Sequence, residues 1–557
     1  MLASEEREKS MEKNVETELK LLFGKKELKA LLELPLVTKK TIKGSHQSLK
    51  LVNAYYDTRD LILRQAGIAY RIRQTGKAFE QTVKMSKRAA GGLTSRGEYT
   101  VSAKGWHPAP DKFNGSGLPL DLEGLLGGAM LEKLFSVRVR REVRLLQVTK
   151  ETVVEMAIDE GHVLAGKKKD TINEVELELK EGRLGDLLEF TAQIAQRIPF
   201  FTESRSKYVR GLNLLGKMDP AAQAWTSFEP EGKSSYAGAV KGQIYQYGTR
   251  ILEEQNAFRE SHIEEEADRI FLPSFRTILR NLFWVRTLFD RAHGLVMNLR
   301  TVTEPLEKLH TLKEFRATWR KLYKSAGPLA GSDKLTDLVE KDIARTADKI
   351  RGQVRDGVYT AVLFSVYAAL EQGSWNAGDY LQLDQMLQLS AERTLEEIHH
   401  RLVEQSRKEA PAAAAGKKGK ERRSKARRQD GGACEEEKLL ARFLEQAAPL
   451  MGHLGDIAGR VKIEALTKDG RKKLARLAES LEGSMARARL LQYAAAQLGQ
   501  VRDAVTACEA GLLCGWLLAA SQAERRKQVK YFRKWAAEVR LPEKADNMPP
   551  RPVPEKA

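Results

Sequence analysis

Two hydrophobic patterns divide the chain. Between about residues 14 and 216, apolar and polar positions alternate in short segments, whereas from about residue 240 to 541 apolar positions recur at helical spacing over long stretches. Alternation is typical of strands with one buried face, and the longer period is typical of amphipathic helices. The sequence therefore predicts an α+β fold, with a mostly antiparallel N-terminal sheet followed by an all-α helical bundle.

The alternating pattern is clearest in four segments: Val15–Leu21, Ile68–Gln74, Phe79–Lys84 and Glu174–Lys180. In the same half, residues 184–197 follow helical spacing instead. Residues 217–239 are rich in Pro, Ser, Gly and Ala and predict an interdomain linker. The second half contains a basic insert at 407–434, which we expect to be disordered, and the tail at 542–557 is expected to be flexible.

The net charge of the chain indicates the class of partner that it binds. The 557 residues include 94 Lys and Arg against 75 Asp and Glu, a formal net charge of +19, which favours a polyanionic partner. The basic insert has no interleaved aromatic residues for base stacking, so no specific nucleic acid is expected.

The sequence predicts neither export of the protein nor a membrane-spanning segment. The first fifteen residues are charged and lack the apolar core of a signal peptide, and the most apolar stretch, 504–520, is too short to span a bilayer. Three cysteines without metal-ligand spacing suit a reducing compartment. We therefore predict a cytoplasmic protein with no membrane partner.

Charged residues of both signs occupy alternate strand positions. Glu16, Glu18 and Lys20 share one strand face, and Glu174, Glu176 and Glu178 share another. A single charged face of this kind is usually solvated. Further alternating pairs are Arg71 with Arg73, Thr82 with Lys84, and Arg96 with Glu98. If these strands close into a curved sheet, the interior would hold carboxylates suited to Mg²⁺ or Mn²⁺ and cations suited to phosphate.

Motifs in this half resemble the CYTH superfamily, also called triphosphate tunnel metalloenzymes. The run Glu16-Thr17-Glu18-Leu19-Lys20 matches the ExExK signature of that family. Further matches follow in family order: Tyr55-Tyr56-Asp57-Thr58, Leu63 through Gly67 to Arg71-Ile72-Arg73, Thr82-Val83-Lys84, Arg96-Gly97-Glu98, Arg141, Asp159, Glu174-Val175-Glu176 and Ser206-Lys207-Tyr208. The resemblance covers residues 14–216 and implies an eight-stranded antiparallel tunnel.

The resemblance also implies residue roles and an activity. Phosphate-binding residues would be Lys20, Arg71, Arg73, Lys84, Arg141 and Lys207. One metal would be held by Glu174 and Glu176 and a second by Glu16 and Glu18, with Glu16, Glu18 and Lys20 as the catalytic set. A water activated by the second metal would attack a terminal phosphorus in line with its leaving oxygen.

Three placements stay open at this stage. Arg138 competes with Arg141 for one tunnel position, because the run Arg138-Val139-Arg140-Arg141 permits either register, and we favour Arg141. Glu178 is either a further ligand or a solvated acid at the end of its strand. Asp159 either supports the metal and orients an arginine or forms a turn.

The helical half carries a second resemblance. The segment from Leu491-Gln492 to Leu498-Gly499-Gln500-Val501-Arg502-Asp503-Ala504 is similar to CHAD domains, which often follow a CYTH domain. That resemblance implies a basic channel for polyphosphate, with Arg276, Arg280, Arg471 and Arg502 as candidate ligands. The histidines that usually open the basic helices are missing, with Pro273 and Lys468 in their places, so the domain is divergent.

Together these observations predict a divalent-metal-dependent hydrolase. Its substrate would be inorganic triphosphate, cleaved to pyrophosphate and phosphate, and its helical domain would engage polyphosphate or a partner. The alternatives are a noncatalytic polyphosphate-binding protein and a related CYTH activity, either adenylate cyclase or thiamine triphosphatase.

Overall fold

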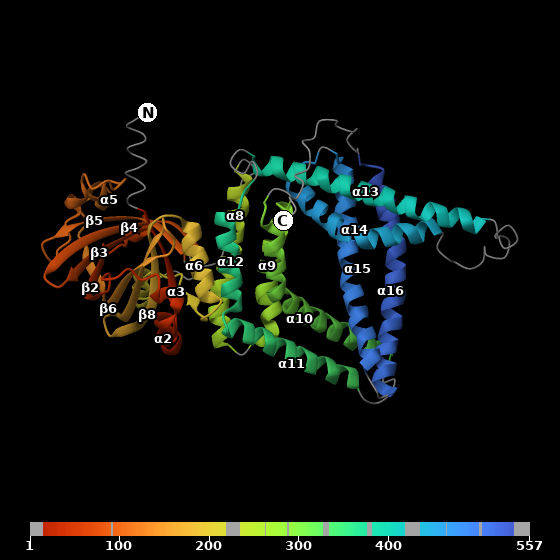
Figure 1. Ribbon diagram of the computed structural model, residues 1–557, viewed down its shortest axis with the longest axis horizontal. Helices are drawn as coiled ribbons and strands as arrows, with labels where there is room; N and C mark the ends of the chain where they lie inside the picture. Colours follow the sequence, from red (N-terminus) through yellow and green to blue (C-terminus); the bar gives the residue numbers. More distant parts are fainter. Residues whose placement is uncertain are drawn as a thin grey trace.

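The protein has a strand-rich half and a helical half that lie against each other (Figure 1). The computed structural model describes residues 15–90, 93–218, 234–261, 263–286, 289–326, 333–375, 381–417, 435–463, 465–500 and 504–539. The predicted α+β architecture is confirmed: an antiparallel barrel is followed by a helical region.

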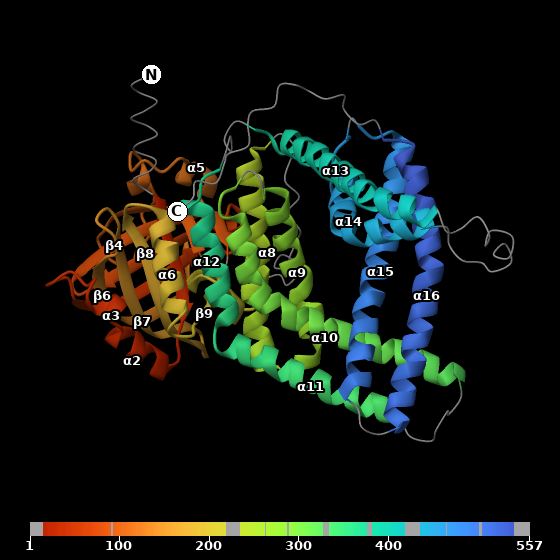
Figure 2. The same cartoon turned by 45° about the vertical axis from the view of Figure 1, so that its right-hand side comes forward.

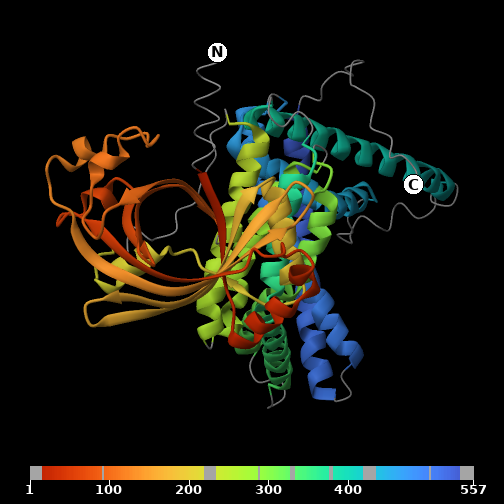
Figure 3. The same cartoon turned by 60° about the vertical axis from the view of Figure 1, so that its left-hand side comes forward.

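Eight antiparallel strands form the barrel. They are β1 (Val15–Leu22), β2 (Gln47–Asp57), β3 (Ile68–Thr75), β4 (Ala78–Ala90), β5 (Leu93–Ala103), β6 (Glu132–Gln147), β7 (Val153–Ala165) and β8 (Lys168–Glu181). Their order is β5-β4-β3-β2-β6-β7-β8-β1, and pairing of β1 with β5 closes the ring. Figure 3 shows the curved wall that results. A closed barrel gives alternate residues an inner face, as the charge pattern requires.

A ninth strand, β9 (Phe201–Thr202), extends the barrel beside β1. Leu21 pairs with Val175 of β8 and also with Thr202 of β9, so the two strands lie on opposite sides of β1. The strand β5 pairs with β1 only as far as Leu19. The short β9 therefore continues the β5 side of β1 past the end of β5.

Short helices cover the ends and outside of the barrel. These are α2 (Lys25–Glu33), α3 (Pro35–Thr38), α4 (Ile62–Gln65), α5 (Leu122–Leu126), α6 (Leu184–Ala195) and α7 (Lys207–Leu214), with a 3-10 turn η1 at Pro110–Phe113. Asp57, at the end of β2, joins two of them. Its buried carboxylate accepts hydrogen bonds from the backbone N–H groups of Leu63 and Arg64 and from the hydroxyl of Tyr208.

The helical half begins at α8 (Tyr236–Glu260) and continues through α9 (Ala267–Trp284), α10 (Ala292–Ala326), α11 (Lys334–Arg355), α12 (Val358–Gln372), α13 (Leu383–Lys417), α14 (Glu435–Arg460), α15 (Lys468–Gln500) and α16 (Ala504–Ala536), with η3 at Glu264–Glu266. The helices α8, α9 and α12 stand beside the barrel, and α10 and α11 lead away from them toward the paired α15 and α16 (Figure 2). None of the described helices is both long and apolar enough to cross a membrane.

Two boundaries differ from those expected. Helix α8 starts within the expected linker, because Ser235 caps it by accepting a hydrogen bond from the N–H of Gly238. Helix α13 continues to Lys417, inside the insert expected to be disordered from residue 407. The alanine run at 412–415 has the highest helix propensity and favours this continuation. Residues 418–434 and the tail at 542–557 lie outside the described part.

The two halves share a hydrophobic core in which α6 packs along α12. Phe200 joins them: its ring centroid lies 5.3 Å from that of Phe23 in the barrel half and 5.9 Å from that of Phe364 in α12. The left-handed Gly357, with φ of 71°, lets the backbone approach, because a Cβ there would lie 3.0 Å from the Cα of Pro199.

Candidate functional site

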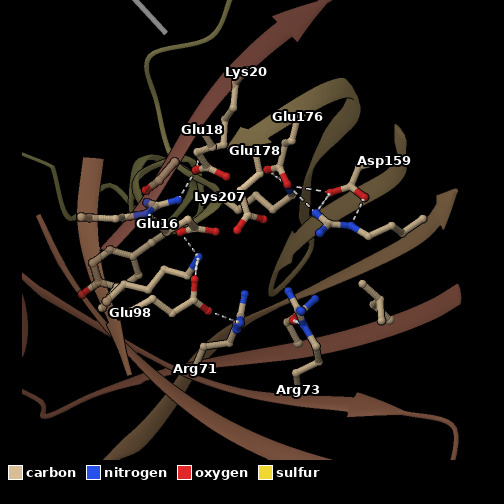
Figure 4. A pocket seen from close by; sticks show the side chains of 18 of the residues that line it. Glu16, Glu18, Lys20, Arg71, Arg73, Glu98, Asp159, Glu176, Glu178 and Lys207 are labelled. Atoms are coloured by element: carbon tan, nitrogen blue, oxygen red, sulfur yellow. Dashed lines mark hydrogen bonds and ion pairs between the residues drawn. The ribbon is translucent and has the colours of Figure 1, made fainter. Parts of the chain in front are cut away.

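The interior of the barrel is a charged cavity of about 370 Å³. Its walls include side chains from β1 through β8 and from the start of α7, and Figure 4 shows them converging on the centre. The charged lining residues are Glu16, Glu18, Lys20, Arg71, Arg73, Lys84, Arg96, Glu98, Arg141, Glu155, Asp159, Glu176, Glu178, Lys180 and Lys207. The structure thus brings together the predicted tunnel residues; Glu174 is not among the lining residues but pairs with one of them, Lys207.

Three buried carboxylates form one cluster on β7 and β8. Oxygens of Asp159, Glu174 and Glu176 lie within 4.8 Å of one another, and the residues are at most 7% exposed. The barrel register sets Asp159 opposite both Glu174 on β8 and Arg141 on β6. Oxygen donors this close are the ligands that hard divalent cations prefer.

Lys207 places its ammonium among these carboxylates. Its Nζ lies 2.8 Å from Oδ2 of Asp159 and 2.8 Å from Oε1 of Glu176, and it also donates to Glu174. Lys207 is the first residue of α7, whose N-terminus is capped by the Ser206 hydroxyl. Burial alone would lower the pKa of Lys207, but the surrounding carboxylates outweigh it and hold that pKa well above its usual range.

Arg141 supplies a second cation to the cluster. Its Nε and Nη2 each donate to Asp159 over 2.7 Å, a bidentate pair, and Nη2 also reaches Glu176. Arg138 is exposed on the other face of β6, so Arg141 is the tunnel residue, as favoured. Although burial opposes it, Lys207 and Arg141 hold the pKa of Glu176 well below its usual range.

The acids of β1 are held by a different set of cations. Lys84 donates to Oε2 of Glu16 over 2.6 Å, and Lys20 donates to Oε1 of Glu18 over 2.8 Å. Arg96 bridges the two acids, donating to Oε2 of Glu16 over 3.1 Å and to Glu18. The sequence motif included Arg96 without giving it a role, because that role depends on β1 pairing with β5, where Glu16 lies opposite Arg96.

The opposite wall has an excess of positive charge. Burial, reinforced by the neighbouring Arg71 and Arg141, lowers the pKa of Arg73 to about 10. Nε of Arg71 is buried and meets no acceptor among the described residues. Within the described part of the chain, only Glu98 offers Arg71 a carboxylate, at 3.5 Å, and Lys84 shares that acid at 2.8 Å. Crowded guanidinium groups of this kind are suited to an anion.

Glu178 lies near one end of the acidic wall. It is opposite Glu18 in the β1–β8 register and accepts a hydrogen bond from Lys180 over 2.7 Å. Burial raises the pKa of Glu178 to about 7, against the effect of Lys180. Glu178 therefore lines the cavity, which differs from the alternative that it is a solvated acid at the end of its strand. The other alternative, that Glu178 is a metal ligand, stays a prediction.

The arginines predicted to bind polyphosphate in the helical half each make different contacts. Arg276 forms a bidentate pair with Glu307, at 2.9 and 2.8 Å. Arg280 lies over the ring of Trp284, 5.4 Å from its centroid, and Arg460 lies 4.8 Å from the same centroid. Arg471 is in the first turn of α15, and Arg502 lies outside the described residues.

Comparison with known proteins agrees with this geometry over the barrel half. Residues 14–210 match the family model described as the CYTH domain, and the chain therefore carries a CYTH domain there. An inorganic triphosphatase from Haemophilus influenzae is 29% identical over 237 residues, which are 41% of this chain and 65% of that protein. The chain thus matches about two thirds of the length of this relative.

Solved structures show weaker likeness. PptA from Streptomyces chartreusis is 15% identical, with a TM-score of 0.37 over 55% of this chain and 100% of that one. The capping enzyme triphosphatase of Mimivirus is 11% identical, with a TM-score of 0.23 over 35% of this chain and 94% of that one. Likeness at this level carries no argument about activity.

Proposed function

We propose that this protein is a divalent-metal-dependent hydrolase that cleaves inorganic triphosphate to pyrophosphate and phosphate. The observation that carries the proposal is the division of the barrel cavity into a carboxylate wall and a guanidinium wall. Carboxylates repel phosphate unless a cation intervenes, so a cavity with both walls suits a phosphate chain bound together with metal. The Haemophilus influenzae relative, named an inorganic triphosphatase, supports this substrate.

The carboxylates fit a divalent ion. Asp159, Glu174 and Glu176 have oxygens close enough to share one cation, and we propose them as its ligands. Glu16 and Glu18 are proposed to hold a second ion after their present cation partners shift. Mg²⁺ or Mn²⁺ in these positions would lower the pKa of a bound water and offset phosphate charge.

The cationic side chains would bind and orient the triphosphate. Arg71, Arg73 and Arg141 present planar groups suited to bidentate contact with phosphate oxygens. Lys20, Lys84 and Lys207 would supply further point charges. A water would attack a terminal phosphorus, the bond to the bridging oxygen would break, and the cations would stabilise the leaving pyrophosphate.

For the helical half we propose a CHAD-like role in engaging polyphosphate. The observation in its favour is that Arg280 and Arg460 both lie within 5.4 Å of the ring centroid of Trp284, with Asp456 near both. Arg276 could join only by leaving Glu307, which weakens its case. Arg280→Ala should lower the affinity for long-chain polyphosphate in a titration at low salt, whereas Arg269→Ala, an exposed arginine on the same helix, should not.

The test of the enzyme proposal is phosphate release from inorganic triphosphate, ATP, thiamine triphosphate and long-chain polyphosphate, each with Mg²⁺ or Mn²⁺. We expect metal-dependent release chiefly from inorganic triphosphate, its abolition by EDTA, and its loss in the Glu16→Gln/Glu18→Gln variant. Preference for thiamine triphosphate, or cyclic AMP from ATP, would assign a related CYTH activity instead. No release, with metal-independent polyphosphate binding, would make the protein a noncatalytic binder.

A further inference from the structure

The segment 199–206 lies between the helical half and the tunnel. It leaves the end of α6, forms β9, and leads directly into Lys207 at the start of α7. Phe200 and Phe201 are buried, at 1% and 8% exposure, and Thr202 is 2% exposed. This bridging segment therefore contacts both the barrel cavity, which Ser206 lines, and the helices, where Phe200 packs near Phe364.

One face of α8 contacts the bridging segment, residues 199–206, through three side chains. Nδ2 of Asn256 donates to the carbonyl oxygen of Thr202 over 2.9 Å. The guanidinium of Arg259 lies over the ring of Phe201, 4.0 Å from its centroid. Glu253 accepts a hydrogen bond from the side chain of Ser204. These three residues follow i, i+3 spacing, which places them on one side of the helix.

On its other side the bridging segment holds residues of the cavity. Thr202 pairs with Leu21 of β1, and the N–H of Glu203 donates to the carbonyl oxygen of Lys20 over 3.1 Å. Lys20 and Glu18 are on the same strand. Four residues after Thr202, Ser206 caps α7 and sets the position from which Lys207 reaches the acidic cluster.

We propose that Asn256 and Arg259 of α8 are positioning residues for the tunnel: through the bridging segment they set the locations of Lys207 and of the Glu18–Lys20 part of β1. This inference rests on the proposed hydrolase function for its kinetic consequence only. Neither residue lines the cavity. Their effect on catalysis is therefore indirect, through the placement of two phosphate-binding lysines.

The kinetic test compares Asn256→Ala, Asn256→Asp and Arg259→Ala with a matched control on the same helix. Asn256→Asp keeps the shape of the side chain but sets a carboxylate against the Thr202 carbonyl. The control is Gln255→Ala, because Gln255 is buried and donates to Thr360 over 2.7 Å within the helical half, without touching the bridging segment. It should cost stability as the others do.

We expect KM for triphosphate to rise and kcat to fall, so that kcat/KM drops about fivefold to tenfold in the Asn256 and Arg259 variants. A decrease of this size corresponds to losing the net free energy of about one hydrogen bond. Gln255→Ala, assayed below its melting temperature, should keep wild-type kinetics. Equal losses in all four variants would overturn the proposal, because they would reflect general destabilisation alone.

Hydrogen exchange gives a readout that does not require turnover. Amides of residues 203–215 and 18–22 should exchange several-fold faster in Asn256→Asp and Arg259→Ala than in Gln255→Ala. If the wild type releases no phosphate, the proposed function fails while this comparison still decides the coupling. Unchanged exchange in both segments would overturn the coupling even in an active hydrolase.

Discussion

The ammonium of Lys207 lies 2.8 Å from Oδ2 of Asp159, in the middle of the carboxylates that are close enough to share a metal ion. The lysine, together with Arg141 and Arg210, offsets the negative charge of the cluster. A divalent ion bound there would compete with this ammonium for the same oxygens. Binding of metal would free Lys207 to turn toward a phosphate. The same side chain would thus offset the carboxylates when no metal is bound and contact a phosphate when one is.

Lys207→Met should therefore tighten metal binding while impairing turnover. Removal of the competing charge leaves buried carboxylates short of a cation, so we expect the Kd for Mn²⁺ to fall at least about tenfold in calorimetry without substrate. Lys180→Met is the control, because Lys180 pairs with Glu178 and Glu155 outside the cluster. An unchanged Kd in Lys207→Met would show that the ammonium does not compete.

Arg96→Met should destabilise the barrel and be rescued by metal. Arg96 is the only described side chain that bridges Glu16 and Glu18, and its loss leaves the buried Glu18 and the partly buried Glu16 with fewer cations. Breaking a buried pair in this way costs about 3 kcal/mol, measured as a lower urea midpoint. Millimolar Mg²⁺ should recover part of the loss; equal midpoints with and without Mg²⁺ would argue against a metal at these acids.

The pKa of Glu178, raised to about 7, predicts a dependence of stability on pH. Because the folded protein then holds this proton more tightly than the unfolded chain does, its contribution to the unfolding free energy falls as pH rises from about 4.5 to about 7. Glu178→Gln should remove about 2 kcal/mol of the stability lost over that range, measured by urea unfolding. Glu160→Gln, exposed on β7, should leave the pH slope unchanged.

Gly211→Ala should disturb α7 through one contact. A Cβ at Gly211 would lie 2.2 Å from the ring of Phe135, which is buried and stacked on Tyr55 with centroids 4.9 Å apart. Overpacking of this kind costs about 1–3 kcal/mol and should lower the melting temperature. In a double-mutant cycle, Phe135→Leu should offset part of the loss; simple additivity would show that the clash is relieved elsewhere.

The periodicity of the sequence indicated four strands of the barrel, β1, β3, β4 and β8, and showed that Glu16, Glu18 and Lys20 share one strand face. The number of eight strands and the closed tunnel came from the resemblance to the CYTH superfamily. The periodicity could not choose between Arg138 and Arg141 from the local run, because both strand faces carry arginine there. That choice depends on β7, where Asp159 lies opposite Arg141. A local pattern fixes which residues share a face, but not which face meets the cavity.

Other parts of the site depend on contacts between distant segments. The bridge from Arg96 to Glu16 and Glu18 exists only because β1 and β5 close the ring. The two-residue strand β9 is too short to show alternation, and the contacts of α8 with it join segments that are far apart in the chain. Pairings of this kind carry no periodic signal in a single sequence.

The ring of Phe200 lies between Phe23 of the barrel half and Phe364 of α12. We therefore do not expect the barrel to fold as an independent domain. Cut away from its helices, the barrel would turn the apolar side of α6 and this phenylalanine toward water. A barrel fragment ending at residue 216 should then aggregate, unless residues 234–539 are supplied as a second chain to complete its interior. The two halves therefore form one folding unit, and a substitution in the core that they share should change the stability of both.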